Sequence, residues 1–161
     1  MAEGTIFKFH NDLDTDQIIA SQYLLLPNLE EMKEHTFESL DPDFPKKVKP
    51  GDFVVGGENF GCGSSREQAP EIIKALGIQC VIAKSFARIF FRNSINNGLL
   101  LIEQPTLYDD IKEGDTVSVV MNEHIDYNGK EYLIASLPEN LMDIIRAGGL
   151  VKAMRKLNGL D

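Results

Sequence analysis

The chain has 161 residues, of which 43% are hydrophobic, and a formal net charge of −9 at pH 7. This length and apolar content suit one compact domain, and the acidic balance argues against general nucleic-acid binding, which needs clustered positive charge. No run of about 18 apolar residues predicts a membrane span, and no basic-then-apolar leader opens the chain. We therefore expect a cytoplasmic protein without nucleic-acid or membrane partners.

Cysteine and histidine are too few and too dispersed to predict a metal centre. Cys62 and Cys80 lack Cys-x-x-Cys spacing, and both are expected to stay reduced in the cytoplasm. The histidines are scattered along the chain, at His10, His35 and His124. We predict no zinc or iron–sulfur site built from this chain alone.

The first third of the chain predicts a strand followed by an acidic turn and an irregular excursion. Alternating residues at 4–9 predict the strand, and acidic and hydroxyl residues at 12–16 predict the turn. A short helix or bend begins at Ile18. The segment at about 22–49 is rich in charge and proline, with one helix expected near 29–37, and we expect it to be mobile.

From residue 48 the pattern becomes regular. β-Branched and aromatic residues predict a strand over 48–57, and a glycine-rich turn follows it. The capping-box spacing Ser65-Arg66-Glu67-Gln68 predicts a helix that begins near Ser64 or Ser65 and ends at Gly77. Pro70 lies within the first turns of that helix and leaves its start less certain.

A second helix follows between two buried strands. The strands are predicted at 80–83 and 99–102, and the helix between them is expected to be capped by Ser85 and ended by residues 97–98. This β-α-β-α-β order predicts an α/β fold whose core is a largely parallel sheet with helices packed against it.

The last third predicts a small β-layer and two helices. Asn128-Gly129, flanked by alternating apolar residues, is the strongest short hairpin signal. The expected strands are 116–120, 125–127 and 131–133, and the expected C-terminal helices are 138–147 and 150–157.

The segment at 59–67 carries the clearest functional signal, because it places glycines, two serines, an arginine and a glutamate between a strand and a helix. Backbone N–H groups at a helix start attract anions, and glycine lets the backbone approach them. No Lys-Ser or Lys-Thr follows, so this is not a Walker loop, and the third glycine of a dinucleotide fingerprint is missing. The pattern alone leaves two alternatives, a site for a carboxylate or phosphate and an ordinary glycine-rich connection.

Two further motifs accompany this turn, one at 12–19 with Asp-Thr-Asp and one at 85–93 with Ser-Phe-Ala-Arg. Together with residues 59–70 they resemble the small subunits of the isopropylmalate dehydratases, in the aconitase superfamily, and the resemblance covers nearly the whole chain. It implies a single swivelling β/β/α domain over 1–161. It also implies the small subunit of a two-subunit hydro-lyase that interconverts 2- and 3-isopropylmalate by dehydration and rehydration in leucine biosynthesis.

The resemblance assigns roles to residues in all three motifs. It implies that Ser64 is the catalytic base, that Ser65 and Arg66 hold a substrate carboxylate, and that Thr15 and Asp16 lie near the proton-relay network. Turn capping explains Thr15 and Asp16 equally well. Supporting roles are expected for Gly61, Gly63, Arg88 and Arg92, with the two arginines either bracing the glycine turn or contacting substrate. Cys62 is expected to be a small filler in the turn.

The cofactor and the partner follow from the resemblance too. The [4Fe–4S] cluster would belong to an iron–sulfur large subunit, in a heterodimer or heterotetramer, so the isolated chain is expected to be inactive and to hold no cofactor. Relatives that act on homoaconitate have Tyr-Leu-Arg-Thr where this chain has Tyr-Leu-Leu-Leu. Leu24, Leu25 and Leu26 therefore predict an apolar substrate group, although packing in a core would explain them as well.

The alternatives are small subunits that act on 2,3-dimethylmalate, citramalate or homoaconitate, and a non-catalytic anion-binding module.

Overall fold

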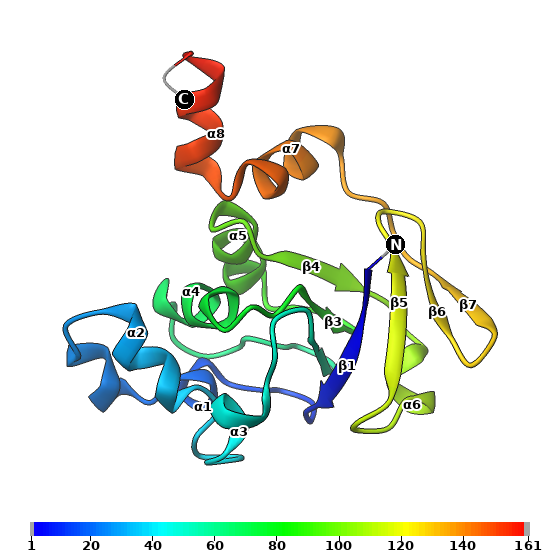
Figure 1. Cartoon of the computed structure of the whole chain (residues 1–161), viewed down its shortest axis with the longest axis horizontal. Helices are drawn as coiled ribbons and strands as arrows, with labels where there is room; N and C mark the ends of the chain where they lie inside the picture. The colour runs from blue at the N-terminus through cyan, green and yellow to red at the C-terminus, as the bar shows by residue number, and fades with distance from the viewer. Residues whose placement is uncertain (1, 160–161) are drawn as a thin grey trace.

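The computed structural model describes residues 2–159, which form an α/β fold around one sheet (Figure 1). The strand order is β4-β3-β2-β1-β5-β6-β7. The strands are β1 (Ala2–Lys8), β2 (Phe53–Gly56), β3 (Cys80–Ala83), β4 (Leu100–Glu103), β5 (Thr116–Val120), β6 (His124–Tyr127) and β7 (Lys130–Leu133). The helices are α1 (Thr15–Ile18), η1 (Ser21–Leu25), α2 (Leu29–Met32), η2 (Lys33–His35), α3 (Phe44–Lys47), α4 (Gln68–Ala75), α5 (Arg88–Asn96), α6 (Leu107–Asp110), α7 (Glu139–Ala147) and α8 (Leu150–Leu157).

One half of the sheet is parallel, as the sequence predicts. β1, β2, β3 and β4 pair in parallel, with Val54 opposite Val81 and Val81 opposite Leu101. Residues of β2 and β3 are buried on both faces, because alternate side chains pack into two different clusters. Val54 and Val81 face α4 and α5, whereas Phe53 and Val55 face the other cluster. A short parallel strand buried on both sides explains the continuous apolar runs.

The other half of the sheet is antiparallel and corresponds to the expected small β-layer. β5 pairs with β1, and β5, β6 and β7 follow as an antiparallel ribbon that extends the same sheet. Asn128 and Gly129 both have positive φ, at 51° and 77°, as a tight hairpin turn requires. The predicted hairpin and the two C-terminal helices are confirmed.

The excursion between β1 and β2 is anchored to the core. Phe37 and Phe44 are fully buried, and their ring centroids lie 4.9 Å apart at an interplanar angle of 81°. Burying one such side chain contributes roughly 2–3 kcal/mol. The helix expected near 29–37 is divided into α2 and η2. Mobility of residues 22–49 stays a prediction, but any motion must leave these two rings in place.

Two predicted helix starts are wrong. α4 begins at Gln68 rather than near Ser64 or Ser65, and no side chain caps it. The later start places Pro70 in the first turn, where a missing N–H costs no hydrogen bond. α5 has Ala87 at its N-cap position in place of Ser85, and no side chain caps it. The Ser85 hydroxyl instead accepts a hydrogen bond from the Asn59 N–H at 2.8 Å.

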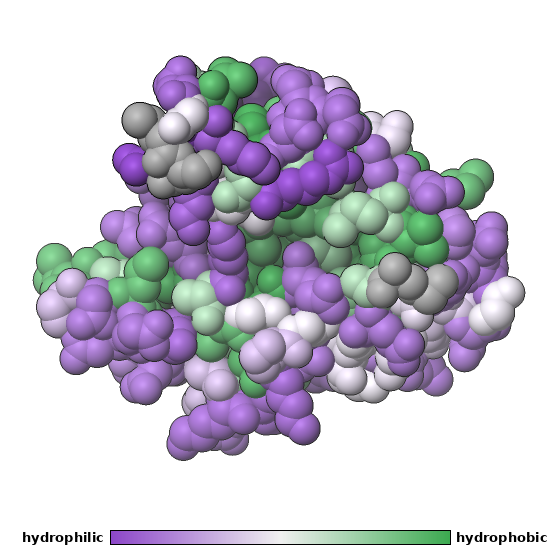
Figure 2. All heavy atoms as spheres, turned by 45° about the horizontal axis from the view of Figure 1, so that its top comes forward, coloured by the Kyte–Doolittle hydropathy of each residue, from purple (hydrophilic) through white to green (hydrophobic). Residues whose placement is uncertain are grey.

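The last helix, α8, packs loosely on the domain, whereas α7 buries Met142. Within α8, no residue is buried, and large apolar side chains remain exposed: Leu150, Val151, Met154 and Leu157. The space-filling view shows apolar side chains lining a hollow beneath this end of the molecule (Figure 2). No helix within residues 2–159 is both long and apolar enough to cross a membrane.

Candidate active site

The three sequence motifs meet at one edge of the sheet because each follows a parallel strand. The Asp-Thr-Asp turn follows β1, the glycine turn follows β2, and Ser-Phe-Ala-Arg follows β3. Carboxyl ends of neighbouring parallel strands lie together, and open α/β sheets bind ligands there. The structure therefore brings together segments that are far apart in the sequence.

Backbone hydrogen bonds join the glycine turn to both neighbours. Isolated parallel bridges pair Asp14 with Cys62 and Phe60 with Phe86. The Thr15 N–H donates to the Cys62 carbonyl at 2.8 Å, and the Phe60 N–H donates to the Ser85 carbonyl at 3.0 Å. The glycine turn is thus held by backbone hydrogen bonds between the Asp-Thr-Asp turn and the Ser-Phe-Ala-Arg segment. Its position does not depend on the side chains of Ser64 and Ser65.

Two glycines make this close packing possible. Gly61 has φ +86°, and a Cβ there would lie 2.2 Å from Cγ of Phe90. Gly63 has φ +92°, and a Cβ there would lie 2.5 Å from a carboxylate oxygen of Asp14. Only glycine combines a left-handed backbone with contacts this close. The supporting role expected for both residues has a clear physical basis.

A cavity of about 330 Å³ opens over the turn. Ser64 and Ser65 are exposed, while Arg66 is partly buried. Within residues 2–159, the backbone N–H groups of Ser64 and Ser65 donate to no protein group, so they remain available to an anion. The cavity is lined by Thr15, Gly61, Gly63, Ser64, Ser65, Arg66, Ala87, Arg88, Ile89, Phe90 and Asn93.

The guanidinium of Arg66 is held by the N-terminal motif. It donates to the Ile19 carbonyl at 2.7 Å and forms an ion pair with the Asp16 carboxylate. The Arg66 side chain is only 13% exposed, whereas that of Asp16 is 62% exposed. Arg66 is therefore pre-oriented, which lowers the entropy that a planar cation loses when it binds a carboxylate.

Thr15 also contacts the glycine turn, but through the backbone of that turn. Its hydroxyl donates to the Ser64 carbonyl at 2.7 Å, and the residue is almost fully buried. Asp14, which the sequence analysis did not select, caps α1 through its side chain and completes a capping box with Gln17. Thr15 lines the cavity, whereas Asp16 reaches the site through its ion pair with Arg66.

α5 contributes a residue that sequence reasoning missed. Asn93 Nδ2 donates to the Ser65 hydroxyl at 3.3 Å. Ile89 and Asn93 both line the cavity and lie four residues apart, which places them on one helix face. The sequence shows the spacing of Ile89 and Asn93, but it does not show where α5 begins. The helix face that these residues share could therefore not be assigned to the site.

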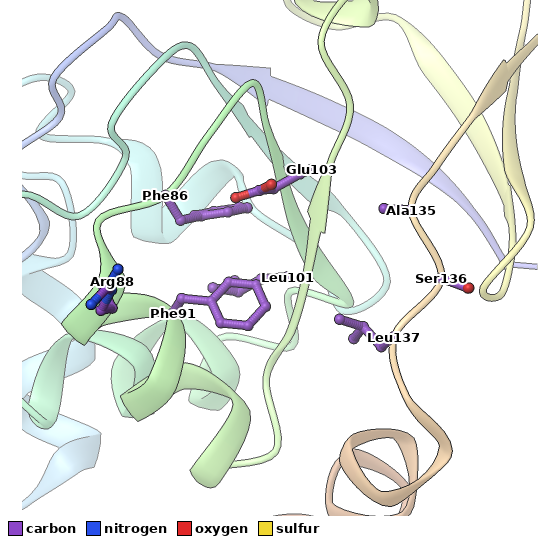
Figure 3. Close-up of a pocket in the computed structure, with 8 residues that line it drawn as sticks. All are labelled: Phe86, Arg88, Phe91, Leu101, Glu103, Ala135, Ser136 and Leu137. Carbon is purple, nitrogen blue, oxygen red and sulfur yellow. The ribbon is translucent and has the colours of Figure 1, made fainter.

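The two arginines of α5 differ in position. Arg88 lines the cavity, whereas Arg92 does not, and both are exposed. Arg88 also borders a second cavity of about 240 Å³ (Figure 3). Phe86 and Phe91 form part of its apolar wall, beside the segment that leads to α7. Neither arginine makes a side-chain hydrogen bond or ion pair within residues 2–159, so bracing of the glycine turn by them stays a prediction.

The three leucines of the first excursion do not line the cavity. Leu24 and Leu26 are partly buried against the main apolar cluster, which is the one that contains Val54 and Val81. Leu25 is 90% exposed. Packing thus accounts for two of the three. Leu25 is the member whose side chain is free to meet a ligand or a partner.

The thiols are poorly suited to nucleophilic roles. Both cysteines are free. Burial, together with the neighbouring Asp14 and Asp12 carboxylates, raises the pKa of the Cys62 thiol, and burial raises the pKa of the Cys80 thiol. Raised pKa values keep thiols protonated and unreactive, which supports the filler role expected for Cys62.

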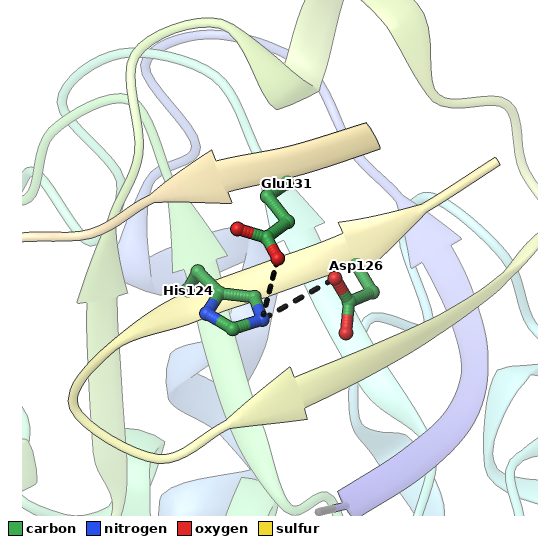
Figure 4. A group of neighbouring side chains, drawn as sticks. All are labelled: His124, Asp126 and Glu131. Atoms are coloured by element: carbon green, nitrogen blue, oxygen red, sulfur yellow. Dashed lines mark ion pairs between the residues drawn. The ribbon is translucent and has the colours of Figure 1, made fainter. Parts of the chain in front are cut away.

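One group of side chains outside the cavity has the composition of a metal site (Figure 4). His124 Nε2 lies 3.3 Å from Asp126 Oδ1 and 3.7 Å from Glu131 Oε2. Pairing of β6 with β7 sets Asp126 opposite Glu131, which the scattered histidines in the sequence did not indicate. A cross-strand ion pair accounts for this geometry when His124 is protonated.

Comparisons with known proteins agree with this architecture. Residues 9–107 match the model of the aconitase C-terminal domain family. The chain is 64% identical over 158 residues to a 3-isopropylmalate dehydratase small subunit of Lachnospira eligens, covering 98% of this chain and 96% of that one. It is 48% identical to an isopropylmalate/citramalate isomerase small subunit of Methanocaldococcus jannaschii, over 96% of this chain and 94% of that one.

A solved structure shows the same fold. The crystal structure of 3-isopropylmalate dehydratase from Methanocaldococcus jannaschii superimposes with a TM-score of 0.91 at 46% identity, covering 97% of this chain and 94% of that one. The meeting of the three motifs, the family match and these relatives lead to one conclusion. The chain belongs to the aconitase C-terminal domain family and, within it, to the 3-isopropylmalate dehydratase small subunits.

Proposed function

We propose that this chain is the small subunit of a hydro-lyase that interconverts 2- and 3-isopropylmalate in leucine biosynthesis. The observation that carries the proposal is the Ser64-Ser65-Arg66 turn, exposed over a cavity with its guanidinium already oriented. Names of close relatives support the substrate. Free cysteines are consistent with action in the reducing cytoplasm.

The reaction removes water across one carbon pair and adds it back in the opposite sense. It needs a base for a C–H bond beside a carboxylate and a Lewis acid for the departing hydroxyl. In this proposal Ser64 takes the proton, while Ser65 and Arg66 hold the carboxylate. A serine hydroxyl is a weak base, so Ser64 must react as the alkoxide. Its hydroxyl proton leaves to solvent before the C–H bond breaks, the unpaired N–H groups and the Arg66 guanidinium stabilise the resulting oxygen anion, and that oxygen then takes the substrate proton.

The Lewis acid belongs, in this proposal, to a large-subunit partner. The sequence contains two cysteines, and the structure places Cys80 at the start of β3, where it is buried, and Cys62 in the glycine turn. They cannot supply the set of cysteine ligands that a [4Fe–4S] cluster requires. The cluster, when bound in the partner, would polarise the departing hydroxyl, and the cavity of this chain would face it.

Co-expression with a large subunit tests the proposal directly. The anaerobically purified complex should turn over 2- and 3-isopropylmalate, and the chain purified alone should turn over neither. Assays should include 2,3-dimethylmalate, citramalate and homoaconitate. Hydratase activity of the chain alone would refute the division of the site between two subunits. Binding of dicarboxylates by the complex without any turnover would favour a non-catalytic anion-binding module.

Citramalate is the second candidate substrate, because one relative of 48% identity is named as an isopropylmalate/citramalate isomerase subunit. The two substrates differ in the size of one apolar group. A higher kcat/KM for citramalate than for isopropylmalate in the co-expressed complex would select this alternative.

Leu25→Arg should give the assembled enzyme measurable turnover of homoaconitate. The leucine is 90% exposed, so the substitution should change stability by less than about 0.5 kcal/mol, while the new cation can pair with an additional carboxylate. The measurement is kcat/KM for homoaconitate relative to isopropylmalate. Leu133→Arg is a matched control, since Leu133 is 74% exposed in β7. A normally folded Leu25→Arg enzyme without homoaconitate turnover would remove Leu25 from substrate recognition.

A further inference from the structure

Three polar side chains connect the two ends of the segment that carries Leu25. The Tyr23 hydroxyl donates to Glu38 Oε1 at 2.5 Å, and His35 Nδ1 lies 2.5 Å from Glu38 Oε2. The rings of Tyr23 and His35 stack with centroids 3.8 Å apart and an interplanar angle of 6°. Both oxygens of one carboxylate are therefore engaged, and the two rings hold each other in plane.

This network lies next to the candidate active site. Tyr23, His35 and Glu38 line a cavity of about 190 Å³ together with Asp16, and Asp16 is the ion-pair partner of Arg66. The Ile19 carbonyl, which precedes η1 by two residues, accepts from Arg66. The segment that carries Leu25 thus begins at Ile19, which binds Arg66, and the hydrogen bonds of Glu38 to Tyr23 and His35 join its two ends.

The network acts together with the packing of η1 to fix the direction of one side chain. Leu24 and Leu26 turn toward the main apolar cluster, and between them Leu25 projects into solvent. Tyr23 packs against the same cluster, and the bond from its hydroxyl to Glu38 fixes the ring further, so Tyr23 sets the rotation of η1 and with it the direction of Leu25. Glu38 is hydrogen-bonded by two groups at once, and these bonds lower the pKa of its carboxyl group, with the Tyr23 hydroxyl as the larger cause.

We propose that Tyr23, His35 and Glu38 are positioning residues for substrate selection. They hold the exposed Leu25 in one orientation, so that its side chain, which lies outside the cavity of this chain, meets the apolar group of the substrate once the large subunit is bound. This inference rests on the proposed function for the identity of the substrate. Nothing in it requires the three residues to touch substrate themselves, because they act through η1.

Tyr23→Phe in the assembled enzyme is the test. Loss of the hydrogen bond to the charged Glu38 should raise KM for isopropylmalate roughly tenfold. The value of kcat should change less than about twofold, because the contact of Leu25 with the apolar group of the substrate is made equally in the ground and transition states. The matched control is Tyr127→Phe. It removes the 2.5 Å hydrogen bond from the hydroxyl of Tyr127, in β6, to Asp115 and should leave KM unchanged. Equal KM values for Tyr23→Phe and wild type would overturn the proposal.

Hydrogen exchange of the isolated chain provides a second measurement that needs no substrate. The Leu26 N–H, which donates to the Tyr23 carbonyl at 3.2 Å, should exchange about tenfold faster in Tyr23→Phe and at the wild-type rate in Tyr127→Phe. An unchanged exchange rate overturns the proposal, and so does faster exchange with unchanged KM. If the wild-type complex acts only on another malate, the proposed substrate fails, and KM for that malate decides the positioning role.

Discussion

Ser64→Ala should lower kcat of the assembled enzyme by about 10²- to 10⁴-fold, the usual contribution of a positioned general base. The fold should tolerate the change, because Thr15 donates to the Ser64 carbonyl and not to its hydroxyl, and because the turn is held by backbone hydrogen bonds. KM should change little, since the proposed carboxylate contacts of Ser65 and Arg66 are left in place. Steady-state kinetics with isopropylmalate, at matched cluster content, measures both constants.

Ser136→Ala is the control for this experiment. Ser136 is exposed and borders the second cavity rather than the one over the glycine turn, so kcat and KM should both keep their wild-type values. A Ser64→Ala enzyme that retains more than about a tenth of wild-type kcat would lack the loss typical of a removed base. In that case the proton must go elsewhere, and Ser64 would be reduced to a substrate contact.

Gly61→Ala should lower the free energy of unfolding by about 3 kcal/mol. A left-handed backbone costs an L-residue roughly 1–2 kcal/mol, and forcing a group into a packed interior costs about 1–3 kcal/mol more. The new Cβ would lie 2.2 Å from Cγ of Phe90, and Phe90 is only 4% exposed, so its ring has little room to move. Urea denaturation of the isolated chain measures the loss.

Gly114→Ala separates the two causes. Gly114 has φ +89°, close to that of Gly61, but no atom within 4 Å of the added Cβ. Gly114→Ala should therefore lower the free energy of unfolding only by the cost of the left-handed backbone, about 1–2 kcal/mol. If both variants lose the same free energy, then close packing of Phe90 against the turn contributes nothing, and the turn is more adaptable than its geometry indicates.

Local signals predicted most of the sheet correctly. Asn128-Gly129 determines its hairpin through two residues that tolerate positive φ, and the buried runs that became β3 and β4 needed no knowledge of their neighbours. Helix starts were less predictable. Ser65 and Ser85 are both good capping residues, but the hydroxyl of Ser85 is engaged by Asn59 and that of Ser65 by Asn93. Tertiary contacts decided both cases.

The candidate site was predictable as a set of motifs and not as a set of contacts. Parallel topology places the three motifs at one edge, which the chain order already implied. The ion pair between Asp16 and Arg66 depends on register between segments, as does the bond from Asn93 to Ser65. The spacing of residues within one segment does not predict the register between two segments. The exposure of Leu25 between two packed leucines likewise follows from the rotation of η1, which composition does not determine.

The ends of the segment that carries Leu25 meet in space. The Phe37 N–H donates to the Ile18 carbonyl at 2.9 Å, so residues 19–36 form a loop whose two ends are joined by a backbone hydrogen bond. A loop whose ends are already joined can change its length at small entropic cost, because closure entropy grows only slowly with loop length. With the proposed role of Leu25, exchange of this one segment would change the substrate preference while the turn that carries Ser64 stays as it is.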